Sequence, residues 1–552
     1  MAAKNDTARI AAPPRALKVN YTQPFATLER DLTLSPPPHL TAGRSPRRPV
    51  AIALAVGAAT AALFACQGDE PELSDASRPN VLLISVDTLR PDHLGAYGYE
   101  KNTSPRIDQL AAEGALFENA VSSSSWTLPA HAALFTGLSD SVHGCYDSDR
   151  RLEDSRVTLA ESFGDLGYRT AGFFAGPFLH PTFGLAQGFE HYVDCSSYAE
   201  QSKAVALHDG TLDTAGIVEA SHRDITNPRV YEQVSLWLAN NFRDEPDNGQ
   251  APKQSDPFFM FVHLWDVHFD FVPPPPYDTM FDPDYAGDLT GENFFRSPRI
   301  NPQMSGADLR HILALYDGEI AWTDHHIGKI LDDLDARGLL ANTIVALVSD
   351  HGEEFFEHGK KGHRFTLYDE VIRIPMILWY PEKIRSGVRI QSPSSLIDIF
   401  PTLLELAGAP KADKVMGRSL LPAINGGSAF EDRLAISELN TLGRNLATFR
   451  GEATKLLLNN DNGHAWTFDL RLDRNESLGQ RVGRQLAKWE VPLIEQSTQL
   501  KLWLDESKTQ WPIATTAPQL SEELAEQLKV LGYLDDDEPK SSGTAAEPKG
   551  QP

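Results

Sequence analysis

Three apolar segments, far apart in the chain, each end on side chains that bind metals. They are residues 81–86, 258–262 and 343–348, which are followed respectively by Asp87, by His263, Asp266 and His268, and by Asp350 and His351. Short runs rich in β-branched and aromatic residues are typical of buried parallel strands. In open α/β sheets, ligands bind beyond the carboxyl ends of the strands. The pattern therefore predicts a parallel sheet with a metal-centred hydrolytic site at one edge.

Helix-like segments alternate with these runs, for instance residues 105–116, 157–166 and 309–334. Such alternation indicates an α/β fold with a parallel sheet. After residue 427, short alternating runs predict a small antiparallel sheet, with a helix at residues 521–531 packed on it. We therefore expect a catalytic domain over residues 79–427, a C-terminal α+β subdomain over 428–535, and a disordered tail over 536–552.

The first 66 residues predict a lead segment and a targeting signal. Three arginines, at 44, 47 and 48, precede an apolar stretch over residues 49–65 that ends at Cys66. This resembles a bacterial lipoprotein signal, in which Cys66 is lipidated. The alternative is a transmembrane anchor, because about 17 apolar residues is the lower limit for spanning. Either way we expect an extracytoplasmic, membrane-anchored protein in the periplasm or at the outer membrane, with residues 67–78 as a tether.

The formal charge of −26 argues against a nucleic-acid partner, because contacts to phosphates need lysine and arginine. It does not exclude anionic substrates, because a bound cation can dominate the local field. The chain has three cysteines, and none of them shows zinc-finger spacing. In an oxidising compartment Cys145 and Cys195 could form a disulfide, but their spacing alone does not decide this.

The segment over residues 125–137, Ser-Trp-Thr-Leu-Pro-Ala-His-Ala-Ala-Leu-Phe-Thr-Gly, places Thr127 at a predicted helix start. Pro129 suits the first turn of a helix, where its missing N–H costs nothing. Unpaired amides and the helix dipole at such a start favour a tetrahedral oxyanion. The Thr127 hydroxyl could attack phosphorus or sulfur if a metal lowers its pKa. The alternative is that Thr127 only caps the helix.

At this point the chain resembles the sulfatase family, within the alkaline-phosphatase superfamily. Residues 78–87 look like the family's first strand, and residues 349–353 look like its second metal motif. The segment around Thr127 resembles the signature C/S-x-P-x-R-x-x-L-x-T-G, with matches at Pro129, Leu134, Thr136 and Gly137. The resemblance covers roughly residues 78–535. It implies an alkaline-phosphatase-like α/β/α sandwich with a mostly parallel central sheet, plus the small C-terminal sheet and helix.

The departures from the family pattern concern the residues that contact the sulfate group in sulfatases. Sulfatases use a cysteine or serine that is oxidised to formylglycine, whereas Thr127 is a secondary alcohol that cannot give this aldehyde. The signature arginine is His131, and the sulfate-contacting Lys and His segment appears as Phe-Ala-Gly-Pro at residues 174–177. The chain thus resembles the threonine branch of the superfamily, which acts on phosphate mono- or diesters, or transfers phosphoglycerol-type groups, through a metal-bound threonine.

The resemblance carries over a set of site residues. The first metal would be held by Asp87, Thr127, Asp350 and His351. A second group, which could bind a second metal or serve as acid and substrate contacts, comprises Asp266, His268, His363 and His263. Thr127, His268 and His363 are the expected catalytic residues. Histidine ligands favour zinc or manganese, with calcium, the family's usual ion, as the alternative.

We therefore predict a hydrolase acting on sulfuric or phosphoric ester bonds, with a small anionic ester or a glycan- or lipid-linked substrate. The leading reading is phosphate ester hydrolysis. The alternatives are sulfate ester hydrolysis by unmodified Thr127, and a catalytically silent glycan-binding lipoprotein of the envelope. The metal-type residues Asp87, Asp350 and His351 argue against the silent protein.

Overall fold

A computed structural model describes residues 78–196, 224–242, 256–427, 433–482, 486–512 and 517–521, together with Leu524, Ala525 and Leu528. All of them belong to one compact unit, Leu73–Pro552. The lead segment, the Cys66 signal and the predicted C-terminal tail lie outside the described residues, as does most of the helix predicted at residues 521–531. Within the described ranges, no helix combines the length and the apolar character needed to cross a membrane.

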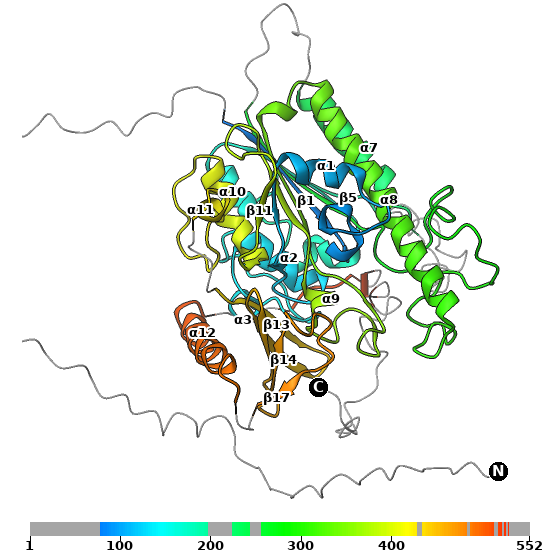
Figure 1. Cartoon of the computed structure of the whole chain (residues 1–552). Helices are drawn as coiled ribbons and strands as arrows, with labels where there is room; N and C mark the ends of the chain where they lie inside the picture. The colour runs from blue at the N-terminus through cyan, green and yellow to red at the C-terminus, as the bar shows by residue number, and fades with distance from the viewer. Residues whose placement is uncertain are drawn as a thin grey trace, which may run out of the picture. The chain divides into compact units, whose positions relative to one another are not determined.

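A central sheet of eight strands organises the unit (Figure 1). Its strands, in spatial order, are β11 (Val388–Ile390), β2 (Ala115–Phe117), β10 (Met376–Trp379), β7 (Thr343–Ser349), β1 (Asn80–Val86), β6 (Phe258–Leu264), β4 (Arg169–Phe174) and β5 (His191–Asp194). Only β10 runs antiparallel to its neighbours. The mostly parallel sheet predicted from the sequence is therefore confirmed.

Successive residues of the central strands enter two different cores. Leu83 of β1 packs in the core on one face of the sheet, while Leu82 and Ile84 pack in the core on the other. Both cores are closed to water, which explains why these strands are apolar without alternation. The first core also holds residues of α2 (Thr127–Thr136), α4 (Leu159–Asp165) and α10 (Ile399–Leu406). The second holds residues of α1 (Pro105–Glu113), α7 (Asn227–Asn241) and α8 (Gly306–Ala336). The result is an α/β/α sandwich.

A second sheet follows in the chain and is antiparallel throughout. Its five strands are β13 (Ala435–Thr441), β14 (Arg444–Arg450), β15 (Thr454–Asn459), β16 (His464–Asp469) and β17 (Gln480–Arg481). The helix α12 (Glu490–Gln510) packs on this sheet through Leu493. Sequence reasoning missed α12, because it has no single apolar face. Leu502 and Trp503 are exposed while Leu504 is buried.

Buried polar contacts hold the small sheet against the catalytic part. Lys455 of β15 is fully buried, and its Nζ lies 3.0 Å from Asp369 and 2.6 Å from Glu476. Asp369 begins the short helix α9 (Asp369–Ile372). This helix follows the segment after β7 that carries Asp350 and His351. The Ser437 hydroxyl of β13 donates to the carbonyl of Ser122, in the segment that leads into α2. The C-terminal sheet therefore supports two segments that shape the site.

Cys145 and Cys195 are both buried and free in the structure. The disulfide between these two residues, which the sequence alone could not decide, is therefore not formed.

Candidate metal centre and nucleophile

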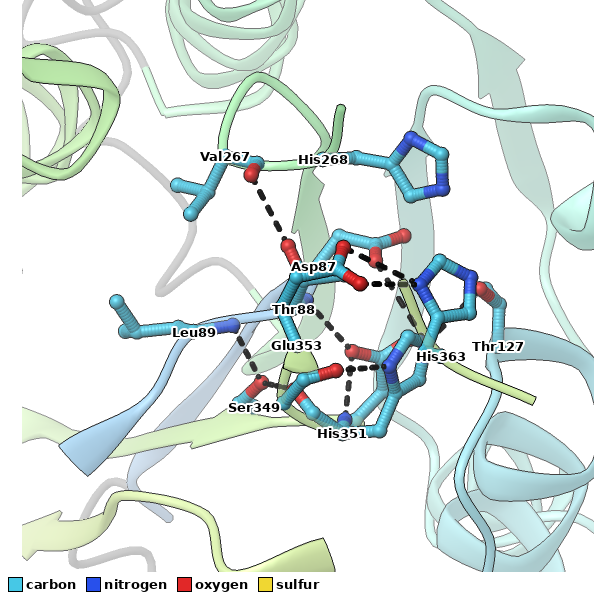
Figure 2. Close-up of polar contacts among 12 residues, drawn as sticks. Asp87, Thr88, Leu89, Thr127, Val267, His268, Ser349, His351, Glu353 and His363 are labelled. Carbon is cyan, nitrogen blue, oxygen red and sulfur yellow. Dashed lines mark hydrogen bonds and ion pairs between the residues drawn. The ribbon is translucent and has the colours of Figure 1, made fainter. Parts of the chain in front are cut away.

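The carboxyl ends of three neighbouring strands bring the metal-type residues together (Figure 2). Val86, the last residue of β1, is level with Leu264 of β6 and with Ser349 of β7. Asp87 directly follows Val86, and Asp350 and His351 follow Ser349. The parallel register thus sets side chains from sequence-distant segments at one height beyond the sheet.

The ligand atoms of Asp87, Asp350 and His351 all lie within 4.8 Å of one another. His351 Nε2 is 3.4 Å from Asp350 Oδ2 and 3.7 Å from Asp87 Oδ1. His263, the penultimate residue of β6, adds its Nε2 at 3.5 Å from Asp87 Oδ2. All four side chains are fully buried.

Hydrogen bonds on the far side of both imidazoles determine which nitrogen faces the carboxylates. Nδ1 of His351 lies 3.0 Å from the Gly352 carbonyl, and Nδ1 of His263 lies 2.8 Å from the Ala175 carbonyl. A carbonyl oxygen can only accept, so each Nδ1 carries the hydrogen and each Nε2 presents a lone pair. Burial lowers the pKa of His263 to about 4, so this ring is neutral at physiological pH. Such fixing of the outer nitrogen is typical of metal-binding histidines.

The inner polar atoms fit a divalent cation. Both oxygens of Asp87, Oδ2 of Asp350 and Nε2 of His263 are buried and have no hydrogen-bond partner among the described residues. Burial raises the pKa of Asp87 to about 7, although His351 and the Thr127 hydroxyl oppose the shift. Unpaired buried carboxylates are costly unless a cation compensates them. Two carboxylates with two imidazole lone pairs form a donor set suited to zinc or manganese.

Thr127 is the first residue of α2, with Trp126 in the capping position. Its Oγ1 lies 3.3 Å from Nε2 of His351, and the side chain is 2% exposed. The hydroxyl therefore faces the same group of ligand atoms from the start of a helix. The amides of the first turn, which no helical carbonyl can satisfy, supply positive potential at this point.

His268 and His363 lie beside this group, with ring centres 5.1 Å apart, and His363 is 4.4 Å from the ring of His351. Nδ1 of His268 lies 2.7 Å from the Phe269 carbonyl, and Nδ1 of His363 lies 3.3 Å from Glu353 Oε2. The Phe269 carbonyl can only accept, so Nδ1 of His268 carries a hydrogen. In the part of the chain that the structure describes, neither ring belongs to a set of three close metal ligands.

Asp266 is not brought into this group. Its Oδ1 accepts hydrogen bonds from N and Oγ1 of Thr226, at 2.7 and 2.5 Å. Its Oδ2 accepts from N of Asn227 at 3.1 Å and from Nε1 of Trp322 at 2.9 Å. The expectation that Asp266 binds a second metal or substrate does not match this geometry, because both oxygens are occupied in holding the start of α7 against α8. Asp266 was expected in the site because it lies two residues before His268, but its position in the sequence does not show that four donors bind its carboxylate.

Replacing Asp266 with asparagine is therefore expected to lower stability without removing metal. The new amide would oppose the donors of Asn227 and Trp322, which costs about 1–3 kcal/mol when buried. Thermal melting and elemental analysis of the purified variant measure the two effects separately. Loss of a metal equivalent in Asp266→Asn, with melting unchanged, would restore Asp266 as a ligand.

Sequence reasoning gave His131 no role beyond replacing the signature arginine. The structure places it, fully buried, one helical turn after Thr127. Its Nδ1 lies 2.9 Å from the Thr127 carbonyl and 3.7 Å from Asp350 Oδ2, and its Nε2 lies 2.9 Å from the Ser85 hydroxyl. His131, His263 and Asp350 also form a group of close ligand atoms. The four-residue spacing from Thr127 was the signal available in the sequence.

The comparisons with known proteins agree with this arrangement. The sulfatase family model matches residues 79–409, more than half of the chain. An arylsulfatase of Clostridium perfringens is 28% identical over 385 residues, which cover 62% of this chain and 78% of the relative. A ulvan-active sulfatase of Formosa agariphila is 28% identical over 390 residues, covering 67% and 68%.

Among solved structures, the phosphonate monoester hydrolase of Agrobacterium radiobacter superposes with a TM-score of 0.61 at 23% identity, covering 78% of this chain and 96% of that one. At this identity the likeness supports the fold. Together with the family match and the clustered ligand atoms, it leads to one conclusion. The chain belongs to the sulfatase family of the alkaline-phosphatase superfamily, and it is a hydrolase of sulfuric or phosphoric esters.

Proposed function

We propose that this protein is a metal-dependent hydrolase of phosphate mono- or diesters in which Oγ1 of Thr127 is the nucleophile. The observation that carries the proposal is the position of this hydroxyl, 3.3 Å from His351 Nε2, at the point where two buried carboxylates also converge. The family's sulfatases carry at this position a residue that becomes an aldehyde hydrate. Threonine cannot be converted in this way, but it retains a hydroxyl that can attack phosphorus.

The metal would be held by Asp87, Asp350, His351 and the Thr127 hydroxyl, with His263 beside them. A bound divalent cation lowers the pKa of a neighbouring hydroxyl and stabilises charge on the ester oxygens. We propose zinc or manganese, because imidazole nitrogens suit these ions better than calcium. The proposal includes the extracytoplasmic, membrane-anchored location expected from the N-terminal segment.

The reaction would proceed in two displacements. Thr127 Oγ1 attacks phosphorus in line, its bond to hydrogen breaks, and the bond from phosphorus to the leaving oxygen breaks. His268 and His363 lie beside the nucleophile's ligand group, so one of them would take the Thr127 proton and return it to the leaving oxygen. Amides of the first turn of α2 face the charge that develops on the phosphoryl oxygens. Water then attacks phosphorus of the phosphothreonine, the bond from phosphorus to Thr127 Oγ1 breaks, and Oγ1 regains a proton. The product is phosphate from a monoester and the remaining phosphate monoester from a diester.

The location of His268 and His363 favours a single metal. His363 contacts both His268 and His351, yet within the described residues neither His268 nor His363 belongs to a set of three close ligand atoms. We therefore assign them to proton transfer and substrate contact, and expect one metal per chain at this site.

Sulfate ester hydrolysis by unmodified Thr127 is the second candidate, and the sulfatase names of the similar relatives favour it. A panel of p-nitrophenyl phosphate, bis(p-nitrophenyl) phosphate, phenyl phosphonate ester and p-nitrophenyl sulfate separates the two. We expect the purified, metal-loaded protein to show its highest kcat/KM on a phosphate ester. A higher kcat/KM on the sulfate would overturn the phosphate assignment and leave the nucleophile to be tested by substitution.

A further inference from the structure

We infer that His131 is a positioning residue for the nucleophile: it connects the backbone of Thr127 to Ser85 of β1, the strand that directly precedes Asp87. The inference deepens the proposed function and rests on it, because it concerns how the Thr127 hydroxyl is held toward the metal centre. The imidazole makes the connection through both of its nitrogens, with one partner on the helix and one on the strand.

The partners of His131 determine where its hydrogen lies. Nδ1 is 2.9 Å from the Thr127 carbonyl oxygen, which can only accept, so Nδ1 is the donor. Burial lowers the pKa of His131 to about 3, so the ring is neutral and Nε2 keeps its lone pair. The Ser85 hydroxyl, 2.9 Å from Nε2, therefore donates to it. Each nitrogen of this buried ring thus has its own protein partner.

This hydrogen bonding makes His131 unsuitable as a metal ligand, although its ring lies close to Asp350 and His263. A neutral imidazole binds a metal through its unprotonated nitrogen. In His131 that nitrogen accepts from Ser85. By contrast, Nε2 of His263 is buried and has no hydrogen-bond partner among the described residues. His131 therefore lies next to the metal centre without belonging to it.

The two partners of His131 belong to the elements that the reaction must hold in register. Ser85 lies in β1, two residues before Asp87. Thr127 begins α2, and His131 follows one helical turn later. Hydrogen bonds from one ring to both elements oppose a shift of the helix start relative to the strand. Because the carbonyl and the hydroxyl of Thr127 belong to one residue, holding the carbonyl restricts where Oγ1 can lie.

The surroundings of the His131 ring leave it little freedom. The side chain is fully buried. The rings of Phe261 and His263, both in β6, lie edge to face with it at 5.8 and 5.0 Å, and the ring of Phe135 in α2 lies at 6.3 Å. A side chain locked in this way by packing and hydrogen bonds can hold a reacting group in one geometry.

Histidine can make both contacts, whereas the arginine of the family signature cannot make them in the same way. Arginine has only donors, so the hydroxyl hydrogen of Ser85 would find no acceptor on it. Asparagine can place an amide N–H where Nδ1 lies, but its side chain is too short to reach Ser85. We therefore expect Ser85 and His131 to affect catalysis through one another.

The test is a double-mutant cycle of Ser85→Ala and His131→Asn, measured as kcat and KM on the preferred ester. We expect kcat to fall about 10-fold in Ser85→Ala and about 100-fold in His131→Asn, which also loses the ring packing, because small displacements of a reacting atom are costly in rate. KM should stay within about threefold, and the metal content per chain should not change. In the double variant, kcat should equal that of His131→Asn within about twofold, because both substitutions remove the same contact.

Ser104→Ala is the matched control, because it removes another buried serine hydroxyl, which donates to Asp108 at 3.0 Å at the start of α1. It should lower the melting temperature and leave kcat unchanged. Independent losses of kcat in the double variant, an unchanged kcat in Ser85→Ala, or loss of metal from His131→Asn would each overturn the positioning role. If His131→Asn does not fold, the comparison of Ser85→Ala with Ser104→Ala decides.

Acid quenching separates this result from a failure of the proposed function. Absence of phosphate on Thr127 in the quenched wild-type reaction would defeat the proposed nucleophile. If phosphate is found there and the kcat losses of Ser85→Ala and His131→Asn are independent, only the positioning role is defeated.

Discussion

Substituting alanine for Thr127 is expected to lower kcat by about 10⁴-fold or more while leaving the fold intact. Removal of an attacking side chain generally eliminates most of the chemical rate enhancement and leaves only binding and charge stabilisation. Thr127 occupies the first position of α2, and alanine, which has a higher helix propensity than threonine, can still begin the helix. Steady-state kinetics on the preferred ester, together with thermal melting, measure both quantities.

Thr127→Ser is the matched control, because it keeps a hydroxyl at the same position and should retain measurable turnover. Acid quenching of the wild-type reaction followed by mass spectrometry should detect phosphate on the peptide that contains Thr127. Full activity of Thr127→Ala would remove this residue as the nucleophile. In that case a water molecule activated by His268 or His363 would be the attacking group.

Chelation of the metal is expected to abolish activity and to lower the melting temperature, with the larger drop in melting temperature at alkaline pH. Without a cation, burial holds the pKa of Asp87 at about 7, compared with 3.8 for the free side chain, and it also raises the pKa of Asp350. A raised pKa in the folded state means that the fold binds the proton more tightly than the unfolded chain. The resulting stability is fully present below pH 3.8 and is lost as the pH rises through 7.

The shift at Asp87 corresponds to about 4 kcal/mol less stability for the metal-free protein at pH 8 than at pH 4. A bound cation removes this penalty by compensating the ionised carboxylates. The measurement is the melting temperature of metal-loaded minus chelated protein at pH 5.5 and at pH 8. An equal difference at both pH values would contradict the assignment of Asp87 to the metal centre.

Asp87→Asn and Asp350→Asn give the independent check. Each should lose the metal in elemental analysis and should respond less to chelation than the wild-type protein does. Because the amide remains neutral, the pH dependence contributed by Asp87 should also disappear in Asp87→Asn. A variant that kept a full metal equivalent would place the ion elsewhere.

Much of the fold could be predicted because a strand that is buried on both faces is apolar at nearly every position. Residues 81–86, 258–262 and 343–348 are apolar on both faces, and the structure shows them as β1, β6 and β7, side by side. The helix α12 could not be predicted, because only scattered residues of it are buried: Leu493 packs on the second sheet, whereas Leu504 packs in a separate core with Val142. Which residues of a mixed helix become buried depends on its partner.

By itself, the sequence determined which residue types the protein has available: a threonine where the sulfatase signature has cysteine or serine, and carboxylates and imidazoles directly after apolar strands. Such properties are local, since they depend on residue type and position along a strand or helix. Only the tertiary structure decided which side chains share a space. It joined His263 and His131 to Asp350, and it occupied both oxygens of Asp266 with donors from the start of α7 and from α8. These juxtapositions arise from strand register and loop packing between segments up to hundreds of residues apart, for which a single sequence carries no local signal.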